Sequence, residues 1–208
     1  MAENRVLEPM DPSNFELSPP QRLAVAYSMS EFRAAFALLL AFDERLGDIV
    51  ERASEPMIAQ MKFAWWYDAI SRGAEARPKG EPMLLALSEL SVPEVDAAML
   101  RLLDAWSLLL AADDWTNELV GCFANVRSAA IFGCYAVWLG EYHDVTAMGA
   151  AWASIDLQRR FGAKVPCPPN GTKLALPTAR KLRPLSILAL SVTGPSAGKM
   201  FWHALTGR

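Results

Sequence analysis

Apolar side chains recur at steps of three and four residues along most of this chain. The clearest runs are Phe32, Phe36, Leu39 and Leu40, followed by Met57, Ile58, Met61 and Trp65. An α-helix has 3.6 residues per turn, so this spacing collects apolar side chains on one helical face. No stretch of six residues alternates apolar and polar positions between turn signals, as a half-buried strand does. The sequence therefore predicts an all-α fold with about eight helices.

Capping and turn residues divide this pattern into separate helices. Ser18 before two prolines is typical of a helix start, and Glu55-Pro56 is expected in the first turn of a later helix. Asp113-Asp114 is expected to cap the helix that follows it. The Gly- and Pro-containing stretches 72–82 and 162–177 are expected to be connections. The expected helices begin near Ser18, Phe32 and Ser54, and then span residues 83–90, 93–110, 115–139, 145–161, 182–192 and 197–205.

The N-terminal stretch differs in character from the rest of the chain. Residues 1–17 are polar and acidic, so they resemble neither a signal peptide nor an arginine-rich transit peptide. We expect residues 1–17 to form a flexible arm and residues 18–208 to form one helical domain. A chain of 208 residues is long enough to bury a substantial core.

Charge and cysteine content exclude several functional classes. The net charge of −3 leaves no basic surface for nucleic acid. Cys122, Cys134 and Cys167 lack C-x-x-C spacing, so neither a disulfide framework nor a zinc site is expected. The longest apolar run, residues 34–42, is shorter than the about 18 residues that a membrane-spanning helix needs. We expect a cytoplasmic protein, either free or peripheral to the inner face of the membrane.

Two segments of the chain resemble a known family. Ala41-Phe42 is followed after four residues by Gly47-Asp48-Ile49-Val50-Glu51, and a later segment reads Met148-Gly-Ala-Ala151-Trp-Ala153-Ser-Ile-Asp156-Leu-Gln-Arg159-Arg160. They resemble the Ala-Phe…Asp-Asp-Ile-Val-Asp motif and the Leu-Gly-x-Ala-x-Gln-Leu-Thr-Asn-Ile-Leu-Arg-Asp helix of the squalene/phytoene synthase family. Trp65-Trp66 and Leu176-Pro177 fall in the order in which that family carries a Trp and a Leu-Pro. The resemblance covers roughly residues 33–177.

This resemblance implies a helical bundle of the isoprenoid-synthase type, without the last helices of full-length synthases. Enzymes of the family join two prenyl diphosphates head to head, and acidic motifs on two facing helices hold Mg²⁺. By this resemblance Asp48 and Glu51 would hold Mg²⁺, whose preferred ligands are carboxylate and phosphate oxygens. Arg33 and Arg159 would contact the diphosphate. Asp156 is what remains of the second acidic motif.

The chain departs from the family motifs at two metal-binding positions. Gly47 stands at the leading aspartate of the first motif, and Arg160 at the closing aspartate of the second. A guanidinium group in a metal-binding position repels Mg²⁺. The acidic residues also have simpler interpretations: Asp48 and Glu51 as a solvated helix face, and Asp156 in a surface ion-pair cluster worth under about 1 kcal/mol.

Three functions therefore stay open. The first is a squalene/phytoene synthase-like protein of isoprenoid metabolism with weak or no synthase activity, using Mg²⁺ if active and a prenyl diphosphate as ligand. The second is a non-catalytic assembly factor or scaffold, as in the mitochondrial complex I assembly factor branch of the family. The third is an isoprenoid- or lipid-binding protein. The large apolar side chains of Met200-Phe201-Trp202 favour a protein partner or a homodimer.

Overall fold

The computed structural model describes residues 15–140, 144–166, 176–177 and 179–194 and positions 202 and 206, and no strand occurs among them. The all-α prediction is confirmed. The α-helices are α1 (Pro19–Tyr27), α2 (Arg33–Glu51), α3 (Pro56–Ser71), α4 (Pro82–Glu89), α5 (Val95–Leu110), α6 (Asn117–Ser128), α7 (Cys134–Trp138), α8 (Thr146–Phe161) and α9 (Arg183–Ser191). A π-helical turn, Ala129–Gly133, joins α6 to α7. Counting α6 to α7 as one stretch, the described part of the chain forms eight continuous helices, as predicted.

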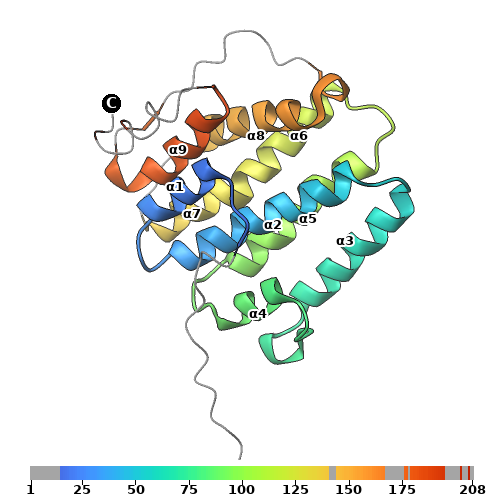
Figure 1. Cartoon of the computed structure of the whole chain (residues 1–208), viewed down its shortest axis with the longest axis horizontal. Helices are drawn as coiled ribbons and strands as arrows, with labels where there is room; N and C mark the ends of the chain where they lie inside the picture. The colour runs from blue at the N-terminus through green and yellow to red at the C-terminus, as the bar shows by residue number, and fades with distance from the viewer. Residues whose placement is uncertain are drawn as a thin grey trace, which may run out of the picture.

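The helices pack around α2 (Figure 1). α5 contacts α2, α3 and α6, while α8 contacts α6 and α9, and α1 contacts both α2 and α9. α3 and α4 lie at one edge of the bundle, away from α8 and α9 (Figure 1). Because α3 is supported mainly by α5, one of its sides is left facing outward.

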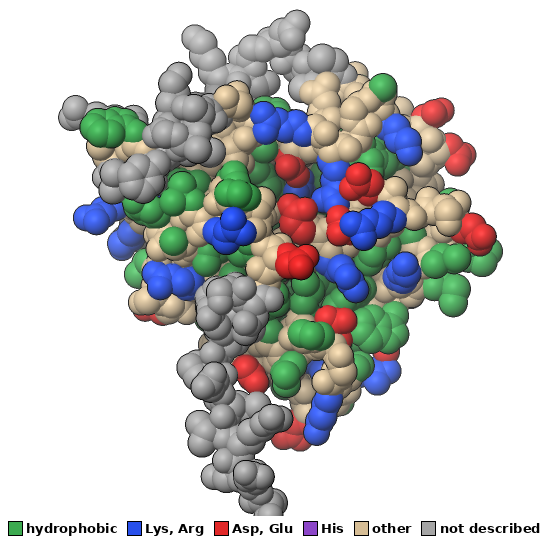
Figure 2. All heavy atoms as spheres, in the orientation of Figure 1, with side chains coloured by type: hydrophobic (Ala, Val, Ile, Leu, Met, Phe, Trp, Pro, Cys, Tyr) green, Lys and Arg blue, Asp and Glu red, His purple; other side chains and the backbone are tan. Residues whose placement is uncertain are grey.

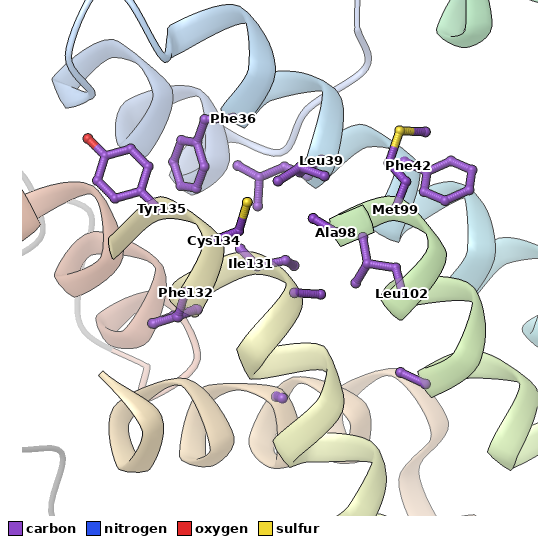
Figure 3. Close-up of a cluster of buried hydrophobic side chains, with 14 of the residues drawn as sticks. Phe36, Leu39, Phe42, Ala98, Met99, Leu102, Ile131, Phe132, Cys134 and Tyr135 are labelled. Carbon is purple, nitrogen blue, oxygen red and sulfur yellow. The ribbon is translucent and has the colours of Figure 1, made fainter. Parts of the chain in front are cut away.

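The core lies where α2, α5 and the α6–α7 stretch meet. Phe36, Leu39 and Phe42 of α2 point toward residues of α5 and α7 (Figure 3), and the ring centroids of Phe36 and Tyr135 are 4.8 Å apart. Residues 35–42 of α2 are all buried, so this half of the helix is enclosed on every side. A charged residue that continues such a helix needs a partner in the bundle.

The start of α6 corrects one prediction. Asp113 and Asp114 do not cap this helix; its N-cap is Thr116, whose hydroxyl oxygen accepts a hydrogen bond from the backbone N–H of Leu119 at 3.2 Å. A threonine hydroxyl placed three residues before a free amide satisfies it directly. The acidic pair therefore lies in the loop before the helix.

The stretch from Asn117 to Trp138 is long and apolar enough to cross a membrane by length and composition. Most of it is buried inside the bundle, as expected for the core helix of a folded domain.

Gly149 sets the distance between α8 and α6. A Cβ atom built there would lie 2.0 Å from Ser128 Oγ and 2.9 Å from Phe132 Cγ, closer than atoms can approach. Glycine lets the two backbones come together, and this contact fixes where the later residues of α8 lie.

The predicted arm and final helix lie largely outside the described residues. Of the arm, only residues 15–17 are described, and Leu17 is buried. Of the helix expected over 197–205, only Trp202 is described. Both predictions stay predictions.

Candidate functional site

The second half of α2 carries a line of carboxylates. Glu44, Asp48 and Glu51 are spaced by four and three residues, so they lie on one face of the helix. That face is turned toward α8, because Arg160 of α8 reaches all three. Figure 2 shows acidic and basic side chains gathered side by side near the middle of this side of the molecule.

Arg160 binds each of these carboxylates with a different nitrogen atom. Its Nη1 donates to Glu44 Oε2 at 2.9 Å, its Nε donates to Glu51 Oε2 at 3.0 Å, and its Nη2 donates to Asp48 Oδ1. The Arg160 side chain is only 16% exposed. Asp48 also lies 3.6 Å from the guanidinium of Arg52. Multiple charge-assisted hydrogen bonds of this kind are stronger than neutral ones, so Arg160 cross-links α8 to α2.

Gly47 makes room for this cross-link. A Cβ atom built at Gly47 would lie 2.5 Å from Nη1 and 2.7 Å from Cζ of Arg160. The guanidinium therefore rests directly against the backbone of α2, in space that any side chain would fill. Gly47 and Arg160 are the two positions at which the sequence comparison above finds no carboxylate in place of a motif aspartate, and in the structure they contact each other.

Glu44 is the most deeply placed carboxylate of this cluster, with a side chain 37% exposed. Burial, and after it the charges of Asp43 and Asp156, raise the pKa of Glu44. The opposing charges of Arg160 and Arg127 are not enough to cancel this shift. Burial alone would lower the pKa of Arg160, but its carboxylate partners outweigh that effect and the pKa lies above its ordinary value. Arg160 therefore stays cationic at every ordinary pH.

A second arginine lies deeper in the bundle, next to the first cluster. Arg127 of α6 and Asp43 of α2 are each 1% exposed. Arg127 donates to Asp43 from Nε at 3.0 and 3.1 Å and from Nη2 at 2.6 Å. Its Nη2 also donates to Asp156 Oδ2 of α8 at 2.7 Å, and its Nη1 to the Ala153 carbonyl at 3.4 Å. One side chain thus joins α2, α6 and α8.

Aromatic rings complete the surroundings of Arg127. Its Cζ lies 4.2 Å from the ring centroid of Trp152 and 5.3 Å from that of Trp106, within the range of cation–π attraction. Trp106 also donates from Nε1 to Asp43 Oδ1 at 2.9 Å. Burial acts to lower the pKa of Arg127, but the charges of Asp43 and Asp156 and their hydrogen bonds raise it above its ordinary value. Arg127 therefore stays cationic inside the bundle.

The structure places the predicted site residues in three regions: where α2 meets α8, at the α1–α2 connection and at the end of α9. Asp48 and Glu51 come together, as predicted, but with Arg160 between them. Asp156 lies beside them and pairs with Arg127.

The two arginines predicted to contact a diphosphate are not brought to this cluster. Arg33 donates to the carbonyls of Ala26 and Ser28 at the α1–α2 connection. It lies fifteen residues before Asp48, about 22 Å away along α2. Arg159 donates to the Ser191 carbonyl at the end of α9, at 2.9 Å.

Asp43, Glu44 and Arg127 were not predicted from the sequence as site residues. The sequence feature that could have indicated them is a charged residue inside an apolar segment. Asp43 directly follows the buried residues 35–42, and Arg127 lies on a helix that continues into apolar residues. Such a charge has to be buried with a partner. Which partner it takes depends on the crossing of α2, α6 and α8, which no local pattern shows.

A surface cavity of about 670 Å³ opens beside Asp48, between the end of α2, α3 and the residue before α4. Its apolar lining includes Ile49, Ile58 and Trp65, and three cations and three carboxylates also line it. The cations are Arg45, Arg52 and Lys62, and the carboxylates are Asp48, Glu55 and Glu81.

The donor set around Asp48 and Glu51 does not fit Mg²⁺. Each carboxylate already accepts a hydrogen bond from Arg160, and a cation beside that guanidinium would be repelled. Among the residues that the structure describes, no three His, Cys, Asp or Glu side chains converge as a metal site would require.

Comparison with protein-family models, with curated proteins and with solved structures finds no significant match to this chain.

Proposed function

We propose that this protein is a squalene/phytoene synthase-like protein of isoprenoid metabolism. It binds an isoprenoid ligand, and its synthase reaction is lost. The observation that carries the proposal is that Arg160 forms an ion pair with each of Glu44, Asp48 and Glu51 on α2. Diphosphate departure needs positive charge that can engage the leaving group. In this chain Arg160 and Arg52, which lie against the acidic face, pair with carboxylates of the protein itself.

The deeper cluster supports the same proposal. Arg127 bridges Asp43 and Asp156 across the helices that would have to frame a metal. Its guanidinium is buried and enclosed by aromatic rings. Two arginines therefore do structurally what bridging metal ions would do, which is to hold acidic helices together. The acidic residues therefore have a structural role that does not depend on catalysis.

A turnover assay tests this proposal. The full chain is incubated with farnesyl or geranylgeranyl diphosphate and Mg²⁺, and release of inorganic pyrophosphate is measured. We expect no release above that of the buffer, and the same result for Glu51→Ala. Release that depends on Mg²⁺ and is lost in Glu51→Ala would refute the proposal.

A second function, binding of an isoprenoid lipid without a metal, is favoured by the cavity beside Asp48. Ile49, Ile58 and Trp65 give it apolar walls, and Arg45 and Lys62 give it cations. No ion pair to Arg45 or Lys62 occurs among the residues that the structure describes. An anionic headgroup with an apolar tail matches this combination.

This second function has its own test. Calorimetric titration with a non-hydrolysable farnesyl diphosphate analogue is performed with EDTA present. Binding that weakens in Arg45→Glu but not in Arg101→Glu, a control at another exposed arginine, would support the lipid-binding function. Equal binding by both variants, or none by the native chain, would refute it.

A further inference from the structure

Helix α3 carries apolar residues on two opposite faces. Ala59, Phe63, Trp66 and Ile70 are buried against the bundle, and the ring of Trp66 meets that of Phe42 at 5.0 Å. A surface helix normally turns polar residues outward. On α3, polar side chains such as Gln60, Lys62 and Asp68 are exposed, but several large apolar side chains are exposed beside them.

The outward side is formed by four large side chains, which we call the α3 ridge. Met57 is 70% exposed, Ile58 46%, Met61 67% and Trp65 44%. Met57, Met61 and Trp65 follow one another at steps of four residues, the spacing of an i±4n ridge on a helix. Figure 2 shows apolar side chains exposed over the region where α3 and α4 lie.

We propose that the α3 ridge is the contact surface of a homodimer, in which two α3 helices pack antiparallel about a two-fold axis at Met61. The ridge is complementary to itself under this operation. Met61 meets Met61 of the second copy, and Met57 of each copy faces Trp65 of the other. Methionine sulfur packs favourably against aromatic rings, and i±4n ridges of two helices interdigitate at about −50°. A two-fold contact of this kind closes on itself and stops at two copies.

The size of the ridge is sufficient for a weak, specific dimer. From the exposed fractions of its four residues, each copy contributes roughly 500 Å² of apolar surface, a size at which exposed patches mark interaction sites. Two copies therefore bury on the order of 1,000 Å², the lower end of specific interfaces.

Charge favours a second copy over a lipid bilayer as the occupant. Ile58, Met61 and Trp65 of the ridge also line the cavity beside Asp48, together with three cations and three carboxylates. The chain as a whole carries a net charge of −3. An anionic membrane attracts a surface with excess positive charge, which this one lacks. A balanced surface can meet its own copy without net repulsion.

The first test is the solution mass of the full chain and of two matched variants. Light scattering after gel filtration should give a mass approaching twice the 22.8 kDa of one chain, over roughly 1 to 200 µM, as expected for a small interface. Met61→Glu places two like charges at the axis and should raise the dissociation constant more than about 100-fold. Tyr67→Glu, on another side of the same helix and also exposed, should leave the mass unchanged.

Cross-linking gives the second test, because the axis specifies which positions meet. In a background with Cys122→Ser and Cys167→Ser, the remaining Cys134 is buried and burial raises the pKa of its thiol to about 12, so it stays unreactive. Met61→Cys should form a disulfide-linked dimer on mild oxidation. Met57→Cys should cross-link only when mixed with Trp65→Cys, and Tyr67→Cys should not cross-link.

Several results would overturn the proposal. A monomer at every concentration would do so, as would a dimer that persists in Met61→Glu with folding unchanged by circular dichroism. Sedimentation of the native chain with phosphatidylglycerol vesicles, lost in Met61→Glu, would assign the ridge to lipid instead. The proposal is independent of the fate of the synthase reaction, since the ridge contains none of the arginine-bound carboxylates.

Discussion

Replacement of Arg127 by methionine tests how the acidic helices are held together. Methionine has a similar volume and no charge, so the substitution leaves Asp43, which is 1% exposed, without its cation. Asp43 would keep only the hydrogen bond from Trp106 Nε1. Asp156 would lose its hydrogen bond from Arg127 as well.

The magnitude follows from the burial of this pair. Removing one partner of a buried ion pair costs about 3–5 kcal/mol, because the other charge stays in the interior without compensation. For a chain of this length that corresponds to a fall of roughly 6–20 °C in the melting temperature. Replacing both partners is milder, because Asp43→Asn removes the uncompensated charge and the amide oxygen can still accept the hydrogen bond from Trp106 Nε1. We therefore expect Asp43→Asn with Arg127→Met to recover most of the loss.

Urea unfolding followed by circular dichroism measures both variants against the native chain. The expected coupling between Asp43 and Arg127 in the double-mutant cycle is about 2–3 kcal/mol. A loss below about 1 kcal/mol for Arg127→Met would contradict the reasoning, since it is the range of an exposed pair. A double variant whose loss in unfolding free energy equals the sum of the two single losses would also contradict the reasoning.

Three further predictions follow from the same structure. Gly47→Ala should stabilise an Arg160→Ala background by about 1 kcal/mol through helix propensity. It should give no gain in the native chain, where the new Cβ displaces the guanidinium. Urea unfolding of the native chain, the two single variants and the double variant measures this coupling, and equal gains in both backgrounds would exclude the contact. The pKa of Glu44 is raised in the folded state, so just above the ordinary pKa of this carboxyl the folded chain binds more protons than the unfolded chain. Stability therefore rises as the pH falls into that window. The native chain should gain stability relative to Glu44→Gln as the pH is lowered from neutral toward the ordinary pKa of a glutamate, and a pH-independent difference would contradict the shift. Glu94 has φ +66°, a conformation that costs a non-glycine residue about 1 kcal/mol. Glu94→Gly should therefore raise the free energy of unfolding by up to that amount, less the contribution of the exposed ion pair between Glu94 and Arg101. A clear fall in the melting temperature of Glu94→Gly would contradict this prediction.

The fold class was predictable because helical spacing is a local property. The apolar steps around Phe36 and Met61 are visible in the sequence, and the structure has helices there. The face occupied by each acidic residue was also predictable, since Asp48 and Glu51 share a face through their spacing alone. Helix starts were less certain: Asp113 and Thr116 both suit an N-cap, and Thr116 is the one used.

The pairing of charges across helices was not predictable from local patterns. Arg160 is adjacent in sequence to Arg159, yet one contacts α2 and the other contacts α9. Successive residues on a helix point about 100° apart, so the neighbours of α8 decide their roles. Gly47 has low helix propensity inside α2, and its close contact with Arg160 explains why a glycine stands there.

Calorimetric titration of Mg²⁺ into the native chain and into Arg160→Asp, in the presence of a non-hydrolysable farnesyl diphosphate analogue, tests whether Arg160 occupies the place of a metal ion. If Arg160 stands where a metal would bind, the native chain shows no Mg²⁺-dependent binding. Arg160→Asp, which frees Glu44, Asp48 and Glu51 and adds a carboxylate, gains it. Mg²⁺-dependent binding by the native chain that disappears in Glu51→Ala would contradict the account.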